Sequence, residues 1–241
     1  MILMMPKRTL YIISAIIITL IILGGFFMFN QSNSQPTLSW HLADKTIIID
    51  PGHGGTFPGK VSKDGVLEKD VNLAIAQHLS NLLQESGCKV IMTRTSDSDL
   101  IPASENESKL ILKQRADLKQ RTIMASENKG DLFISIHCNS IPSDKWCGAQ
   151  TFFAPDNATS QLLAQNIQST LIKQLKNTER EAIARPDTFL FKNLTIPAVI
   201  VECGFLSNAE ETALLTDSAY QQKIAYAVFC GISNYLAEDN N

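Results

Sequence analysis

Ile47-Ile48-Ile49-Asp50-Pro51-Gly52-His53-Gly54-Gly55 is the stretch of this chain that decides its fold class. Three consecutive β-branched residues predict a short, buried strand. The acid, proline and glycine that follow end the strand, because proline lacks a backbone donor and fixes φ while glycine allows a tight turn. His53 is therefore expected at the C-terminal end of a strand. In an open α/β sheet, ligands and catalytic groups collect at that edge.

The rest of the chain alternates apolar runs with amphipathic segments. Further strands are expected at 88–94, 131–137, 148–154, 188–191 and 198–201. Helices are expected at 67–86, 110–128, 158–176, 208–215 and 220–236. This alternation predicts an α/β fold with a single, mainly parallel, twisted β-sheet of about six strands flanked by helices.

The chain's size and charge suit one ordinary globular domain. It has 241 residues with 44% hydrophobic content, and we expect one domain over residues 45–237. The formal charge is −3 and no basic stripe is present, which argues against a nucleic-acid partner.

The first 29 residues differ in composition from this domain. Lys7 and Arg8 precede an uncharged run from Leu10 to Phe29, which matches the roughly 20 residues that a helix needs to cross a bilayer. The basic flank should stay cytoplasmic and the remainder lie outside the membrane. We expect an N-terminal transmembrane helix that stays as an anchor, in preference to a cleaved signal. The polar residues 30–44 should form a tether.

Four polar residues are expected at one edge of the sheet. His137 and Glu202 end their strands as His53 does, and Glu68 begins the helix after the His53 loop. Two histidines and one carboxylate are the ligand set of a catalytic zinc with an open position for water. A second carboxylate can then serve as general base and acid in amide hydrolysis. From the residues alone, Glu68 and Glu202 are both candidates for the ligand. Burial favours Glu202 as the acid/base, and a helix start favours Glu68 as the ligand.

Other polar residues have less specific patterns. Arg94, Asn139 and Arg185 are expected substrate contacts, with a surface ion pair as the alternative for Arg94. Arg121 is expected on a solvated helix face. Asp50 could accept a hydrogen bond from a ligand histidine or simply form the turn.

Four motifs carry a resemblance to a known family. These are 50–55, 67–70, 135–139 and 201–208, which read DPGHGG, LEKD, SIHCN and VECGFLSN. In combination they resemble the zinc-dependent N-acetylmuramoyl-L-alanine amidases of the Amidase_3 family, from about Lys45 to Leu236. Residues 92–94 and 141–150, together with the anchor, are similar to germination-specific members found in endospore formers. The chain departs from the family at Cys138 and Cys203, where aliphatic residues are usual; alternation along the strand should turn both away from the metal and into the core.

The resemblance implies a function and a division of roles. It implies Zn2+ on His53, Glu68 and His137, with Glu202 catalytic. The implied substrate is the amide between the lactyl group of N-acetylmuramic acid and L-alanine on the glycan strands of spore cortex peptidoglycan. Its cleavage removes stem peptides before a separate enzyme completes muramic-δ-lactam, which is needed for cortex recognition in germination.

The implied location is the forespore intermembrane space. A GerS-like lipoprotein assists zinc binding in clostridial relatives. The alternatives are a cell-wall binding protein with an inactive amidase-like site, or a metallopeptidase that cuts within the stem.

Overall fold

The computed structural model describes residues 8–9, 11, 16–20, 41–101 and 110–239. Two compact units are distinguished, residues 1–38 and residues 39–241. No helix among the described residues is long and apolar enough to cross a membrane. The transmembrane helix expected over 10–29 and the tether expected over 30–44 fall mainly outside the described residues, so both stay predictions.

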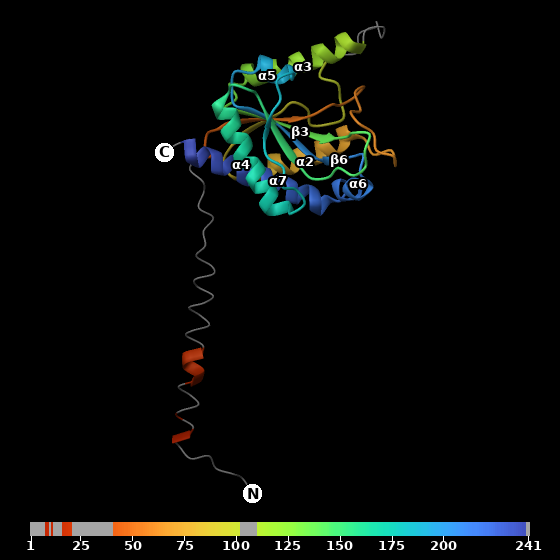
Figure 1. The fold of residues 1–241 in the computed structure, drawn as a ribbon. Helices are drawn as coiled ribbons and strands as arrows, with labels where there is room; N and C mark the ends of the chain where they lie inside the picture. The colour runs from red at the N-terminus through yellow and green to blue at the C-terminus, as the bar shows by residue number, and fades with distance from the viewer. Residues whose placement is uncertain (1–7, 10, 12–15, 21–40, 102–109, 240–241) are drawn as a thin grey trace. The chain divides into compact units, whose positions relative to one another are not determined.

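A six-stranded sheet forms the centre of the second unit (Figure 1). Its order is β2-β1-β3-β6-β4-β5. β1, β2, β3 and β6 run parallel, and only the pairing of β4 with β6 is antiparallel. The strands are β1 Thr46–Pro51, β2 Lys89–Met92, β3 Leu132–Asn139, β4 Gln150–Phe153, β5 Ile183–Ala184 and β6 Ala198–Phe205. The mainly parallel α/β sheet predicted from the alternating pattern is confirmed.

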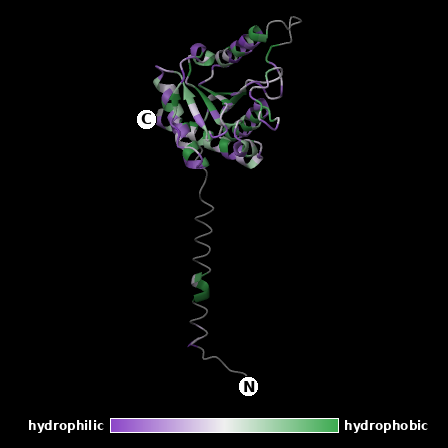
Figure 2. Cartoon of the chain, turned by 45° about the vertical axis from the view of Figure 1, so that its right-hand side comes forward, coloured by the Kyte–Doolittle hydropathy of each residue, from purple (hydrophilic) through white to green (hydrophobic). Residues whose placement is uncertain are grey.

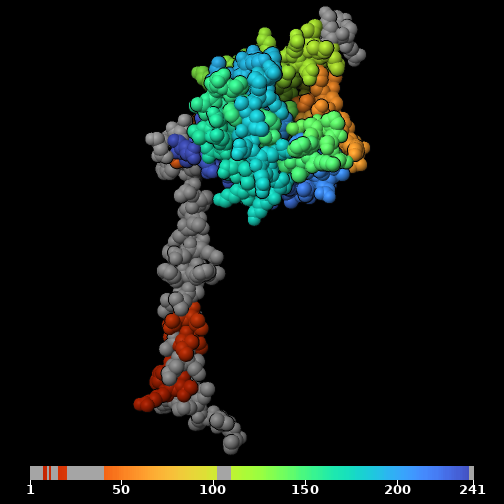
Figure 3. All heavy atoms as spheres, in the orientation of Figure 1, coloured from red at the N-terminus to blue at the C-terminus, as the bar shows by residue number. Residues whose placement is uncertain are grey.

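Helices cover both faces of the sheet. The helices are α2 Glu68–Glu85, α3 Leu110–Glu127, α4 Ala158–Leu175, α5 Phe189–Asn193, α6 Ala209–Leu215 and α7 Ser218–Asp239. In Figure 1, α3 and α5 lie on one side of the sheet, and α2, α4 and α7 lie on the other. The space-filling view shows the teal and cyan segments, which include α4, forming a continuous surface over one side of the unit (Figure 3).

Strand alternation divides the interior into two apolar cores. Along β3, Leu132, Ile134 and Ile136 enter the larger core with α2, α4 and α7, whereas Phe133 enters the smaller core with α3 and α5. The hydrophobic residues of the central strands accordingly lie inside the unit (Figure 2). Cys138 and Cys203 are buried in the larger core, as the alternation predicts.

One expected strand is a helix. Residues 188–191 were expected to be extended, but α5 begins at Phe189. Leu190 and Phe191 are both buried in the smaller core, and adjacent strand residues would point to opposite faces. A helical turn can place both on one side. The strand that completes the six-stranded sheet is instead β5. Its residues Ile183 and Ala184 are both exposed, so the sequence has no buried apolar run that could indicate this strand.

Candidate metal centre

The loop after β1 holds its histidine through an unusual backbone conformation. His53 has a φ of 64°, in the left-handed region that non-glycine residues seldom adopt. Two glycines let side chains approach this backbone closely. A Cβ on Gly52 would clash with the ring of His137, and a Cβ on Gly59 would lie 2.5 Å from Glu68 Oε2 and 2.7 Å from His53 Cδ2. Gly52, in the stretch that decides the fold, and Gly59, in the loop that follows it, therefore make room for the three predicted ligands.

The three predicted ligands converge on one oxygen. Glu68 Oε1 lies 3.1 Å from His53 Nε2 and 2.9 Å from His137 Nδ1. One donor atom from each of the three residues lies within 4.8 Å of the others. The two imidazole rings meet edge to face, with centroids 5.0 Å apart. The residues come from the β1 loop, the first turn of α2 and the end of β3, so segments distant in sequence build one donor set.

Glu68 is held by several donors in addition to the histidines. Its Oε2 accepts from the Lys60 amide at 2.8 Å, and its Oε1 accepts from the Cys138 amide and from Asn72 Nδ2. Burial alone would raise the pKa of Glu68, but the hydrogen bonds and charges of His137 and His53 outweigh it. The pKa of Glu68 therefore lies far below its usual value, and the carboxylate is ionised, as a ligand must be.

The donor set fits a zinc ion. Burial alone would lower the pKa of His137, but the hydrogen bond and charge of Glu68 raise it above the usual value. A bound cation would take the place of that proton, because a metal binds the neutral imidazole ring. Two imidazoles and one carboxylate leave a fourth tetrahedral position for water or substrate. The arrangement can therefore hold Zn2+ in a site of the catalytic kind.

Glu202 lies next to this donor set on the neighbouring strand. The register of β3 and β6 pairs His137 with Glu202 directly. Glu202 Oε1 lies 3.4 Å from Arg185 Nη1, while its buried Oε2 has no hydrogen-bond partner within the part of the chain that the structure describes. Burial raises the pKa of Glu202, although the charges of His137 and Arg185 oppose the rise. A carboxylate with one free oxygen and a raised pKa suits proton transfer.

The expected substrate contacts have different surroundings. Arg185 is partly exposed, and its guanidinium carbon lies 3.8 Å from the centroid of the Phe152 ring. Asn139 is partly exposed at the end of β3, and its Oδ1 accepts from the Ser140 amide. Asn139 follows His137 by two residues on β3, and Arg185 Nη1 lies 3.4 Å from Glu202 Oε1.

Arg94 has a different environment from the one expected. Its side chain is buried rather than in a surface ion pair, and its guanidinium donates to the carbonyls of Pro51, Gly52, Ser96 and Lys69. It therefore braces the loop that carries His53. Its expected contact with substrate stays a prediction, and its burial counts against that role.

The expectation for Arg121 is wrong. The residue is only 2% exposed, and it donates to the carboxylates of Asp50 and Asp117 and to the carbonyls of Pro51 and His53. A guanidinium at this depth needs acid partners, and two are supplied. The spacing of Asp117 and Arg121, four residues apart on a helix, was the signal that could have revealed the pair. Asp50 serves this network and accepts from Thr93 and Ser135 as well.

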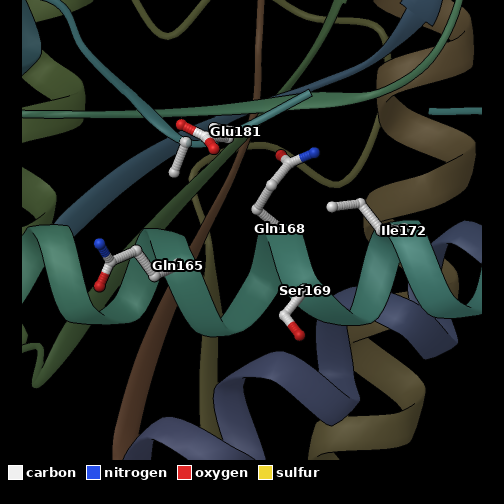
Figure 4. Close-up of a pocket in the computed structure, with 6 residues that line it drawn as sticks. Gln165, Gln168, Ser169, Ile172 and Glu181 are labelled. Carbon is white, nitrogen blue, oxygen red and sulfur yellow. The ribbon is translucent and has the colours of Figure 1, made fainter. Parts of the chain in front are cut away.

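Two cavities differ in whether the predicted metal donors line them. A small cavity of about 50 Å³ is lined by both histidines and by Arg121. A larger hollow of about 390 Å³ lies beside α4, where Gln165, Gln168, Ser169, Ile172 and Glu181 surround it (Figure 4). None of the three metal donors lines that hollow. The predicted donors therefore lie at the C-terminal edge of the parallel strands, away from the larger hollow.

Comparison with known proteins shows the family to which the chain belongs. The family model described as N-acetylmuramoyl-L-alanine amidase matches residues 47–234. The germination-specific N-acetylmuramoyl-L-alanine amidase of Bacillus subtilis is 41% identical over 90% of this chain and 92% of its own length. The CwlD amidase of Clostridioides difficile, solved in complex with the GerS lipoprotein, superposes with a TM-score of 0.79. It is 44% identical, covering 81% of this chain and all of that one. The catalytic domain of CwlV from Bacillus (Paenibacillus) polymyxa is 31% identical with a TM-score of 0.69, covering 80% of this chain and 98% of that one. The chain therefore belongs to the N-acetylmuramoyl-L-alanine amidase family.

Proposed function

We propose that this chain uses zinc to hydrolyse the amide between the lactyl group of N-acetylmuramic acid and L-alanine in peptidoglycan. His53, Glu68 and His137 would hold the ion, and Glu202 would transfer protons. The observation that carries the proposal is the convergence of three donor atoms within 4.8 Å, with Glu202 paired in register to His137. A binding protein would have no need for a buried, incompletely bonded carboxylate next to a complete ligand set.

The chain's own residues supply the proton transfers. When bound, zinc would polarise the amide carbonyl and lower the pKa of a water molecule. Glu202 accepts the proton of the attacking water and then donates it to the nitrogen of the leaving L-alanine. Its raised pKa helps the second transfer, because a more basic carboxylate retains the proton until the nitrogen takes it. Arg185, 3.4 Å from Oε1, orients this carboxylate and leaves Oε2 for the transfer.

The biological substrate would be spore cortex peptidoglycan. The support is the 41% identity with the germination-specific amidase of Bacillus subtilis over most of both chains. Removal of the stem peptide would expose the muramic acid for the later formation of muramic-δ-lactam, the modification by which the cortex is recognised in germination. The chain would therefore act during sporulation, before germination needs the finished cortex.

The proposed location rests on the N-terminal sequence, and the proposed partner rests on a related solved structure. The uncharged run over 10–29 would anchor the chain in the membrane, with residues 30–44 as a tether and the catalytic domain on the outer side, in the forespore intermembrane space. A GerS-like lipoprotein would assist zinc binding; the support is that CwlD of Clostridioides difficile was solved in complex with GerS.

Metal and product analysis test the proposal together. The purified protein, alone and with a GerS-like partner, should contain about one zinc per chain and release intact stem peptides from muropeptides. Mass spectrometry should find muramic acid with a free lactyl carboxylate, and chelation with EDTA should stop the reaction. Activity after complete metal removal would contradict the zinc mechanism. Cleavage within the stem would indicate a metallopeptidase, and zinc content near zero under both conditions would indicate a binding protein.

A further inference from the structure

A row of polar side chains crosses three neighbouring strands beside the metal donors. The register pairs His137 of β3 with Glu202 of β6, and Glu202 with Gln150 of β4. Neighbouring strands lie about 4.8 Å apart, so Gln150 lies about 10 Å from His137 across the sheet. Arg180 Nη1 then donates to Gln150 Oε1 at 3.4 Å. The row therefore leads from the metal donors, through the catalytic carboxylate, to a guanidinium.

Arg180 is oriented by neutral groups. Its guanidinium carbon lies 5.2 Å from the ring centroid of Trp146 and 5.1 Å from that of Phe205. Its Nε donates to the Cys147 carbonyl at 3.2 Å. Gln150 is itself fixed, because its Nε2 donates to the Glu181 carbonyl at 3.0 Å. The guanidinium is thus held in a defined position while remaining partly exposed, next to an exposed Trp146.

No acid neutralises this guanidinium directly. Among the described residues, no carboxylate oxygen lies within 4.0 Å of Arg180, in contrast to Arg121 and Arg185. Glu211 is close enough for Arg180 to lower its pKa, yet burial is the larger effect and raises it. The two oxygens of Glu211 already accept from the amides of Gly148 and Phe205. Arg180 therefore has partners that orient it but no counter-ion.

We infer that Arg180, with Trp146, Phe205 and Gln150, forms a subsite for a carboxylate on the peptide stem of the substrate. An extended peptide advances about 3.3–3.6 Å per residue. Arg180 lies beyond Glu202 by one strand spacing plus one hydrogen bond, about 8 Å in all. This distance corresponds to two residues of an extended peptide. The subsite would therefore bind the carboxylate of the second stem residue, through the paired donors of a planar guanidinium. This inference rests on the proposed amidase function.

Paired substrates test the subsite. Two muropeptides would differ only at the second stem residue, which carries a free carboxylate in one and a carboxamide in the other. The zinc-loaded protein should prefer the carboxylate about tenfold in kcat/KM. Arg180→Gln should remove this preference, mainly by raising KM for the carboxylate substrate, because the side chain lies away from the reacting atoms. Arg180→Lys should keep part of the preference, since the charge remains but the planar fork is lost.

Control variants distinguish a failure of the subsite inference from a failure of the proposed amidase function. Arg115→Gln removes one positive charge from an exposed position on α3 and should keep the tenfold preference. Trp146→Phe should keep the preference and Trp146→Ala should reduce it, because an aromatic face holds the guanidinium. A wild-type protein that cleaves both substrates equally, or an Arg180→Gln variant that keeps the preference, would overturn the inference. Failure of the wild-type protein to cleave either substrate would instead count against the amidase function itself.

Discussion

The two halves of the proposed site, a ligand half with Glu68 and a catalytic half with Glu202, are held in opposite ways. On the ligand half, Glu68 is bonded by two imidazoles, two backbone amides and Asn72, and Arg94 and Arg121 brace the loop that carries His53. On the catalytic half, Glu202 has one contact at 3.4 Å to a partly exposed arginine, and its second oxygen has no hydrogen bond to the described residues.

The difference matches the tasks proposed for the two halves. Metal ligands must hold fixed positions, so a dense network of hydrogen bonds that orients them strengthens binding. A group that exchanges protons must keep an oxygen free, and its carboxylate must not be stabilised so strongly that it cannot take up a proton. Removing a residue from the ligand half should therefore remove the metal, whereas removing one from the catalytic half should leave the metal and slow the reaction.

Glu68→Ala should have the largest effect. It removes the oxygen on which both histidines converge, and water cannot replace a ligand held by so many neighbours. We expect loss of zinc from the purified protein, measured by elemental analysis, together with loss of activity down to background. Glu85→Ala, at an exposed position near the end of the same helix, should keep both. Stoichiometric zinc in Glu68→Ala would remove the contrast between the two halves.

Glu202→Gln should have the next largest effect and should act on turnover alone. The amide keeps the shape of the side chain but cannot accept and return a proton, so kcat should fall by about 10²–10⁴-fold. Zinc content should stay at the wild-type level. Glu210→Gln, an exposed neighbour at the start of α6, is the matched control and should leave turnover unchanged. Equal metal loss in the Glu68 and Glu202 variants would show that the roles are not divided.

The same contrast explains what could be predicted from sequence. His53, Glu68, His137 and Glu202 were identifiable because each follows or precedes an apolar run at a strand or helix end, and topology brings such ends together. The supporting residues lacked such a signal. The spacing of Arg121 from Asp117 could have indicated an ion pair, but its other partners, Asp50, Pro51 and His53, lie about 70 residues away in the chain. Arg180 depends on Gln150 and Trp146, which the chain brings near only through the antiparallel strand β4.

Arg121→Met tests how far the bracing of the ligand half determines stability. The change leaves Asp50 and Asp117 buried without their cation, and breaking a buried pair in this way typically costs about 3–5 kcal/mol. Urea unfolding of the metal-free protein should show that loss. Arg115→Met, at an exposed position on the same helix, should change the free energy of unfolding by less than about 0.5 kcal/mol. A loss below about 1 kcal/mol in Arg121→Met would mean that the network is dispensable for the fold.

The pH dependence of stability should change in the same variant. Burial alone would raise the pKa of Asp50, but the charge of Arg121 and the hydroxyl groups of Ser135 and Thr93 outweigh it and hold the pKa below its usual value. A carboxyl whose pKa is lowered on folding stabilises the protein above its unfolded value, and this contribution is lost as the pH falls through the folded value. Arg121→Met removes the largest cause of the lowering. Its free energy of unfolding should therefore decline less than that of the wild type between pH 6 and pH 3.

Arg185→Gln should have the smallest effect, because it removes a single long contact from the catalytic half, which has few contacts. The guanidinium is partly exposed and contacts Glu202 at 3.4 Å, so its contribution is limited by solvent screening. We expect kcat to fall by no more than about tenfold, with zinc content unchanged. Arg185→Lys should recover part of this loss, since a cation again faces the carboxylate. A fall as large as that of Glu202→Gln would show that Arg185 takes part in the reaction directly, and loss of zinc would show that the two halves of the site depend on each other.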